Sequence, residues 1–212
     1  MKEQQFSIIE TFKFSWKKFK EKALFFIGIG LLSAVIGSIG EVHNYTEIMG
    51  NLETFNRFNL VSCLGFLLSI YLSLGVWKIS VMHLRGEDIQ LNDLFSVSLE
   101  QYINYIIASI ICTVAVVLGL VLFLIPGIHI ICRLLIMPGY IVDKNQSFDE
   151  AIKSSWNDTK GQAMHLFLWL LFSCLIVFAG ILALVVGMFI ALPLISLALA
   201  YVYIQISGKQ QQ

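Results

Sequence analysis

The chain has 212 residues, of which 58% are hydrophobic and only 13% are charged, whereas an average soluble domain has about 25% charged residues. This apolar excess is too large for the core of one soluble domain, so it predicts an all-α polytopic membrane protein whose solvent is lipid. The formal net charge of zero excludes the overall basic field with which a protein attracts nucleic acid.

The first expected element is a short amphipathic helix in the segment ETFKFSWKKFKE, residues 10–21. Ser7 and Glu10 have the spacing of a capping box, which starts a helix, and apolar residues recur at helical spacing as far as Phe19. We expect this helix to lie in the cytoplasmic membrane interface, with Trp16 as an anchor at headgroup depth. The alternative is a solvated helix that binds a partner protein. Two spans follow, at residues 23–40 and 60–78, the second fraying toward Leu84.

The middle of the chain predicts a second unit of the same kind, over residues 88–142. A weaker amphipathic pattern runs through residues 91–102 and precedes a span at 103–125. The fourth span, residues 128–142, is short and is bracketed by Pro126-Gly127 and Pro138-Gly139. We interpret the first pair as a tight turn between two spans. The alternative is a substrate site, since interrupted spans mark such sites in some transporters.

The last unit, residues 146–206, begins with a second polar segment, EAIKSSWNDTKG, in which Trp156 takes the place of Trp16 as an interfacial anchor. The two polar segments align without a gap at an offset of 140 residues, and Ser147 and Glu150 repeat the spacing of the capping box. The apolar run 166–206 would be about 60 Å long as a single helix, about twice the hydrocarbon thickness. We therefore expect two spans with a tight turn near Gly187.

The sequence thus predicts a single membrane domain, residues 1–212, with six spans in three hairpin units, 1–84, 88–142 and 146–206. Each unit is led by an interfacial helix, so the chain has the pattern of an internal repeat. Most of the Lys and Arg residues fall on one side of this topology, and cytoplasmic loops carry such an excess. We therefore expect both termini in the cytoplasm.

One segment, LFLIPGIHIICRLLIMPGYIVDKNQSFDEAIKSSWNDTKG at residues 122–161, resembles a bacterial integral-membrane family. That family includes the membrane domain of glycerophosphoryl diester phosphodiesterases. The similar elements are Pro126-Gly127, Arg133, Pro138, the acidic turn at Asp143 and the Ser155-Trp156 signature. The resemblance implies a six-span protein of the bacterial cytoplasmic membrane. It implies no enzymatic activity, because the phosphodiesterases carry a separate soluble catalytic domain for which this chain has no room.

Arg133 is the one charge that the sequence places well within a span, and such residues are costly and are candidates for function. A structural role would pair Arg133 with backbone carbonyls freed near Pro126 and Pro138. A functional role would place it on a lipid phosphate or another ligand. His129 lies one turn earlier on the same helix face and joins Arg133 as a candidate contact.

These patterns favour a non-enzymatic integral membrane protein that organises or assists other membrane components through its cytoplasmic interfacial helices. The expected partners are membrane lipids and another membrane protein, with no cofactor and no metal, since no metal-ligand spacing occurs. One alternative is a transporter or a permease for lipids or peptides with its site near Arg133. A second is a membrane enzyme acting on lipid, for which the sequence offers no catalytic constellation.

Overall fold

The computed structural model describes residues 7–33, 35, 60–182 and 186–208, and every regular element in them is a helix. Five helical stretches in this part are long and apolar enough to cross a membrane, which confirms an all-α, multi-pass membrane protein. They are Cys63–Leu84, Leu99–Val121, Ile125–Lys144, Ala163–Leu182 and Gly187–Ser207. The first predicted span, residues 23–40, is described mainly as the short apolar helix Ala23–Ser33, and most of its remainder lies outside the described residues.

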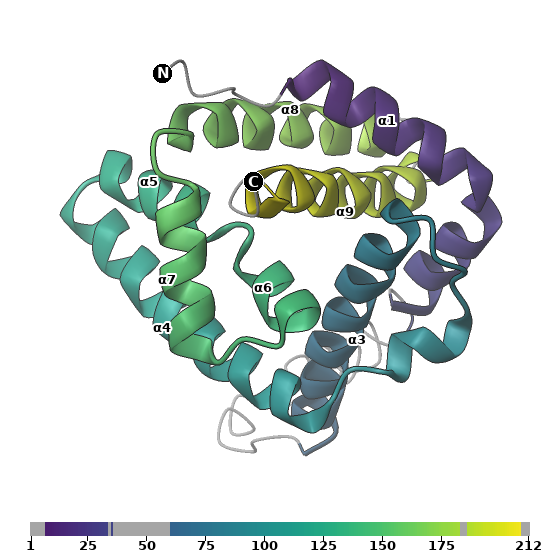
Figure 1. Cartoon of the computed structure of the whole chain (residues 1–212), viewed down its shortest axis with the longest axis horizontal. Coiled ribbons are helices and arrows are strands. Elements are labelled where there is room, and N and C mark those ends of the chain that lie inside the picture. Colours follow the sequence, from purple (N-terminus) through teal and green to yellow (C-terminus); the bar gives the residue numbers. More distant parts are fainter. Residues whose placement is uncertain (1–6, 34, 36–59, 183–185, 209–212) are drawn as a thin grey trace, which may run out of the picture.

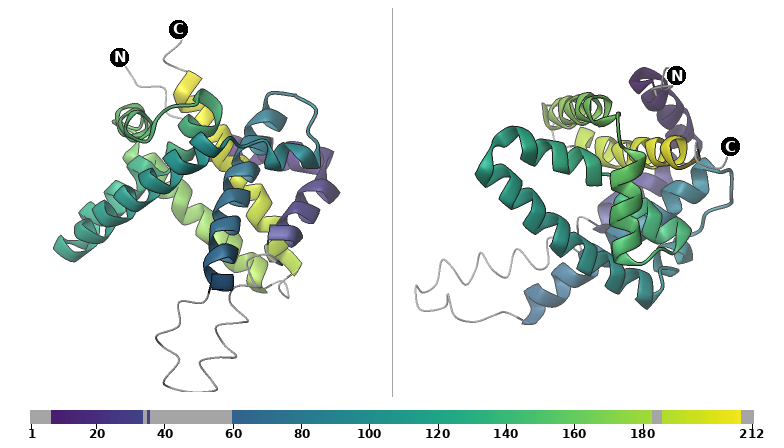
Figure 2. Two further views of the ribbon diagram at one scale, coloured as in Figure 1. Left: turned by 90° about the horizontal axis from the view of Figure 1, so that it is seen from below. Right: turned by 60° about the vertical axis from the view of Figure 1, so that its left-hand side comes forward.

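The labelled elements follow one another in the order shown in Figure 1. They are α1 (Ile8–Glu21), α3 (Leu60–Leu84), the 3₁₀ helix η2 (Leu91–Phe95), α4 (Leu99–Leu122), α5 (Leu124–Leu134), α6 (Met137–Lys144), α7 (Phe148–Asp158), α8 (Ala163–Leu182) and α9 (Val186–Ser207). Successive spans run in opposite directions, so the C-terminal ends of α3, α6 and α9 meet (Figures 1 and 2). We call this the polar end of the bundle; η2 and α7 also lie there.

The short helix α6 lies at the centre of the bundle, among α3, α4, α7 and α9 (Figure 1). Six consecutive residues, Met137 to Val142, are buried. Gly139 permits the closest contact, because a Cβ there would lie 2.6 Å from the ring of Tyr203 on α9. The Tyr140 ring also meets Tyr203 edge to face, at 5.1 Å between centroids. Helix α6 therefore packs tightly on α9, the last span.

The fourth span differs from the single helix predicted at residues 128–142. It consists of α5 and α6, which are separated at Leu135 and Ile136. Pro138 stands in the first turn of α6, where its missing N–H is not needed, whereas in a continuous helix it would remove one hydrogen bond and clash with the preceding turn. Pro138 therefore accounts for the break.

The turn between α4 and α5 lies three residues before the predicted Pro126-Gly127 turn. The chain reverses at Phe123, whose backbone is extended (φ −163°, ψ 148°), and Pro126 stands in the first turn of α5. Gly127 packs on α4, since a Cβ there would lie 2.8 Å from the backbone nitrogen of Leu120, and one on Gly119 would lie 3.0 Å from the Cα of Gly127. Gly127 thus permits a close approach of α4 and α5, and neither it nor Pro126 forms the turn itself.

The predicted amphipathic helix at residues 91–102 is not a single helix. Helix η2 ends at Phe95, and Ser98 and Gln101 form a capping box that starts α4. Side chains of α3 bind the carbonyls between them: the Tyr71 hydroxyl donates to the oxygens of Phe95 and Val97 at 2.8 and 3.0 Å, and Lys78 Nζ donates to that of Ser96 at 2.7 Å. Tertiary contacts with α3 therefore hold the segment in place of a longer helix.

The last two spans, α8 and α9, pack against each other. Helix α8 ends at Leu182 and α9 begins at Val186, so the predicted turn residue Gly187 lies inside α9, and residues 183–185 lie outside the described part. A Cβ on Gly180 would lie 3.0 Å from the carbonyl oxygen of Gly187 and 3.3 Å from the Cβ of Ala191. Small residues on both helices thus permit a close crossing.

We predict that Gly139→Ala destabilises the protein by about 1–3 kcal/mol, because the added methyl group must displace a buried aromatic ring. Thermal unfolding of the purified protein in detergent measures the effect. Gly28→Ala is the matched control, since a Cβ at that helical glycine meets nothing within 4 Å. Equal unfolding temperatures for the two variants would contradict the close packing of α6 on α9.

Candidate functional site: the polar end of the bundle

Arg133 lies near the end of α5 and is buried, with 7% of its surface exposed. Its guanidinium donates through Nη2 to the carbonyl oxygen of Trp156 at 2.5 Å and lies 4.5 Å from the centre of the Trp156 ring. Arg133 thus binds a backbone carbonyl, but this carbonyl belongs to α7 and is not one of those predicted near Pro126 and Pro138. A cation over an aromatic face adds attraction to the hydrogen bond.

Side chains at the end of α7 also donate hydrogen bonds back to the backbone of α5. The carbonyl oxygen of Arg133 accepts hydrogen bonds from the hydroxyls of Ser155 at 2.8 Å and Thr159 at 3.2 Å. Ser155 on α7 and Thr159 just after it are both fully buried. Arg133 and the C-terminal end of α7 therefore exchange donors and acceptors, which holds α7 against α5 in the middle of the fourth span. One donor, the buried Nε, has no hydrogen-bond partner among the described residues.

His129 and Trp156 meet at the outer edge of this contact. The His129 ring is exposed and stands edge to face with Trp156 at 6.3 Å between centroids. The indole of Trp156 therefore contacts both predicted candidate residues, His129 and Arg133, while 39% of its surface remains exposed. Trp16, its counterpart on α1, packs on Phe19 at 5.7 Å and is similarly exposed.

Helix α1 packs on the bundle through its own face. Phe12 contacts Trp169 and Phe172 of α8, at 6.0 and 5.0 Å between ring centroids, and Phe19 is buried. His83 at the end of α3 donates through Nε2 to the carbonyl oxygen of Lys18 at 3.0 Å. Like α7, α1 thus lies fixed against the spans, and its other side remains open.

A second polar group at this end joins three helices, and sequence analysis missed it. Arg85, just after α3, forms a two-pronged ion pair with Asp143 of α6, at 2.5 Å between Nη1 and Oδ1 and 2.7 Å between Nη2 and Oδ2. The Tyr203 hydroxyl donates to the same carboxylate at 2.8 Å. Burial lowers the pKa of the Arg85 guanidinium, but the hydrogen bond and charge of Asp143 outweigh it and raise this pKa above its ordinary value.

The predicted order of the spans was enough to place Arg85 and Asp143 close together. Arg85 follows α3 and Asp143 lies near the end of α6, two spans that run in the same direction, so an antiparallel bundle places both residues at the same level. The sequence interpretation treated Asp143 only as an acidic turn. The Asp143 side chain is 7% exposed, so its charge depends on Arg85 and Tyr203 for compensation.

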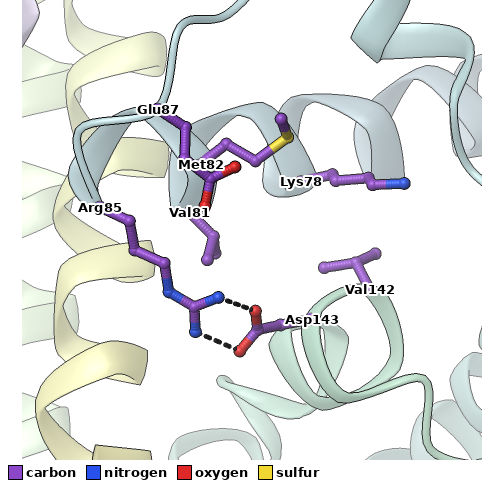
Figure 3. A pocket seen from close by; sticks show the side chains of 7 residues that line it. All are labelled: Lys78, Val81, Met82, Arg85, Glu87, Val142 and Asp143. Carbon is purple, nitrogen blue, oxygen red and sulfur yellow. Dashed lines mark hydrogen bonds and ion pairs between the residues drawn. The ribbon is translucent and has the colours of Figure 1, made fainter.

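A pocket of about 260 Å³ opens beside the ion pair, between α3 and α6 (Figure 3). Val81 and Val142 face into it from α3 and α6, and most of the other side chains around it are charged. The residues that line it are Lys78, Val81, Met82, Arg85, Glu87, Val142 and Asp143. The two cations and two acids among them balance in charge.

Three further hydrogen bonds hold α6 to its neighbours at this level. The Tyr140 hydroxyl donates to the Asp158 carboxylate at the end of α7. Gln101 near the start of α4 donates through Nε2 to the carbonyl oxygens of Ile141 and Val142, both at 3.3 Å. Within the described residues, no group of three or more His, Cys, Asp or Glu side chains could hold a metal ion.

Comparison of the chain with protein-family models, with curated proteins and with solved structures found no match.

We predict that Asp143→Asn destabilises the protein by about 1–3 kcal/mol, because it weakens two hydrogen bonds from Arg85 and one from Tyr203 at a buried site. Asp149→Asn is the control, since Asp149 forms an exposed pair with Lys153 at 3.2 Å and such pairs contribute at most about 1 kcal/mol. Thermal unfolding in detergent ranks the two. A larger loss for Asp149→Asn would contradict the role given to Asp143.

We also predict that Arg133→Gln releases α7 from α5 without unfolding the spans. Losing a charged hydrogen bond of about 1.5–3 kcal/mol should speed amide hydrogen exchange in α7 roughly tenfold or more. Exchange measured by mass spectrometry on the full chain tests this, with the exposed Lys153→Gln as the control. Unchanged exchange in α7, or equal acceleration in every helix, would contradict a local clamp.

Proposed function

We propose that this chain is a non-enzymatic integral membrane protein that organises or assists other membrane components through α1 and α7. The observation that carries the proposal is the common placement of these helices. Each is fixed to the spans along one face, and each leaves a tryptophan and several charged side chains exposed on the other.

The physical basis of the proposal is the rigidity of these helices. Two buried phenylalanines hold α1, and buried Ser155 and Thr159 hold α7. An exposed aromatic side chain on a fixed helix loses little conformational entropy on binding, and such aromatic residues are frequent in interfaces. We take the cytoplasm as the side on which these helices lie, from the excess of lysine and arginine in the corresponding loops. The resemblance at residues 122–161 supports the bacterial inner membrane as the location.

A permease is the second candidate, and one observation favours it. The pocket between α3 and α6 places charged groups beside Val81, Met82 and Val142, and small-molecule sites also combine apolar side chains with a few polar groups. Its site would then lie at Arg85 and Asp143 rather than at Arg133, whose guanidinium and carbonyl are engaged by α7. A catalytic role for the charged loop after α3 has less support, because His83 binds the backbone of α1 and Asp88 pairs with Lys22.

Site-specific photocrosslinking in the native membrane tests the proposal. A photoreactive residue is placed at exposed Lys17 on α1 or Asn157 on α7, and the control position is Val114 on the exposed face of α4. We expect one protein partner to be captured repeatedly from α1 or α7 and not from Val114. Capture of lipid alone at all three positions would contradict the organising role. Uptake or export that fails in Asp143→Asn, with the protein still folded, would favour the permease.

A further inference from the structure

One stripe of side chains on α1 alternates between apolar and basic residues. Its members are Ile9, Lys13, Trp16, Lys20 and Leu24. Spacings of three and four residues place the first four along one side of α1, next to the buried Phe12 and Phe19. Leu24 lies in the following helix, just after the turn at Lys22. All five are exposed, with Ile9 at 65% and Leu24 at 88%. The stripe is therefore a continuous surface that ends on the apolar helix Ala23–Ser33.

The positive charge of the stripe is not neutralised within the described part of the protein. Neither Lys13 nor Lys20 forms an ion pair there, and Lys20 Nζ lies 5.9 Å from the centre of the Trp16 ring. The acid Glu21 pairs with Lys18 at 2.9 Å, outside the stripe. Two cations thus face outward beside an indole and two aliphatic side chains.

The position of the stripe indicates what it meets. Only Lys22 separates α1 from the apolar helix Ala23–Ser33, so Lys20 lies within about one helical turn of the first span. At that depth aliphatic side chains and tryptophan meet the acyl boundary, while lysine reaches the phosphates. We propose that the α1 stripe is a docking surface for the headgroups of anionic phospholipids, with Lys13 and Lys20 on the phosphates and Trp16 between them.

Helix α7 carries a related stripe that differs in charge. At the offset of 140 residues its members are Asp149, Lys153, Trp156, Lys160 and Met164. Asp149 stands where α1 has Ile9 and pairs with Lys153 at 3.2 Å, and Arg133 covers the Trp156 ring. One cation is thus neutralised and the aromatic face is occupied, so α7 should select anionic lipid less than α1. It provides an internal control.

This inference concerns lipid rather than protein partners, and so it stands or falls separately from the organising function. The test is native mass spectrometry of the full-length, detergent-purified protein, titrated with phosphatidylglycerol or with phosphatidylcholine of the same acyl chains. We expect wild type to retain more phosphatidylglycerol. Because each lysine near an anionic surface contributes about fivefold in affinity, Lys13→Gln with Lys20→Gln should lower phosphatidylglycerol binding roughly 10-fold or more and leave phosphatidylcholine unchanged.

Three controls decide the outcome. The charge-keeping pair Lys13→Arg with Lys20→Arg should retain the preference, and Lys153→Gln with Lys160→Gln should reduce it less than the α1 pair does. Raising the salt concentration should weaken the preference, as screening requires. Equal retention of the two lipids by wild type, or an undiminished preference in the folded Lys13→Gln, Lys20→Gln variant, would overturn the proposal and leave the stripe to an acidic protein partner.

Discussion

The burial of α6 is the constraint on which the other contacts depend. A short helix with six consecutive buried residues must have its polar groups satisfied by neighbouring helices, because neither water nor lipid can do so. Asp143 pairs with Arg85 and accepts a hydrogen bond from Tyr203, and Tyr140 donates a hydrogen bond to Asp158. These partners come from the ends of α3, α9 and α7, so satisfying one short helix fixes the relative positions of three others.

Arg133 in the fourth span likewise joins two helices through polar groups. Arg133 could have marked a ligand site, since an intramembrane charge is costly. Its guanidinium instead binds the Trp156 carbonyl, and its own carbonyl accepts from Ser155 and Thr159. The Trp156 carbonyl is in the last turn of α7, where carbonyl groups have no hydrogen-bond partner within the helix. The Arg133 guanidinium supplies a donor to it. Other polar groups of the bundle stand in the pocket beside Arg85 and Asp143 and on the outer faces of α1 and α7.

Helices α1 and α7 differ in what they present, although their sequences align. Each begins after a serine, at Ile8 and Phe148, and the following helices begin at Ala23 and Ala163, so both pairs are separated by the offset of 140 residues that the alignment predicts. The internal repeat itself stays a prediction. Trp16 lies beside Lys20, whereas Trp156 lies beneath Arg133. The same local pattern therefore gives an exposed basic surface in one place and a helix held against α5 in the other.

The sequence by itself determined the helical class, the multi-pass membrane character and the starts of α1 and α7, because hydropathy, period and capping act between residues a few positions apart. Only the tertiary structure decided the break at Pro138, the docking of residues 91–97 on Tyr71 and Lys78, and the pairing of Arg85 with Asp143, 58 residues apart. These features depend on which helix ends reach the same level and how closely Gly139 lets them approach. No local pattern contains that information, because each partner is supplied by a distant part of the chain.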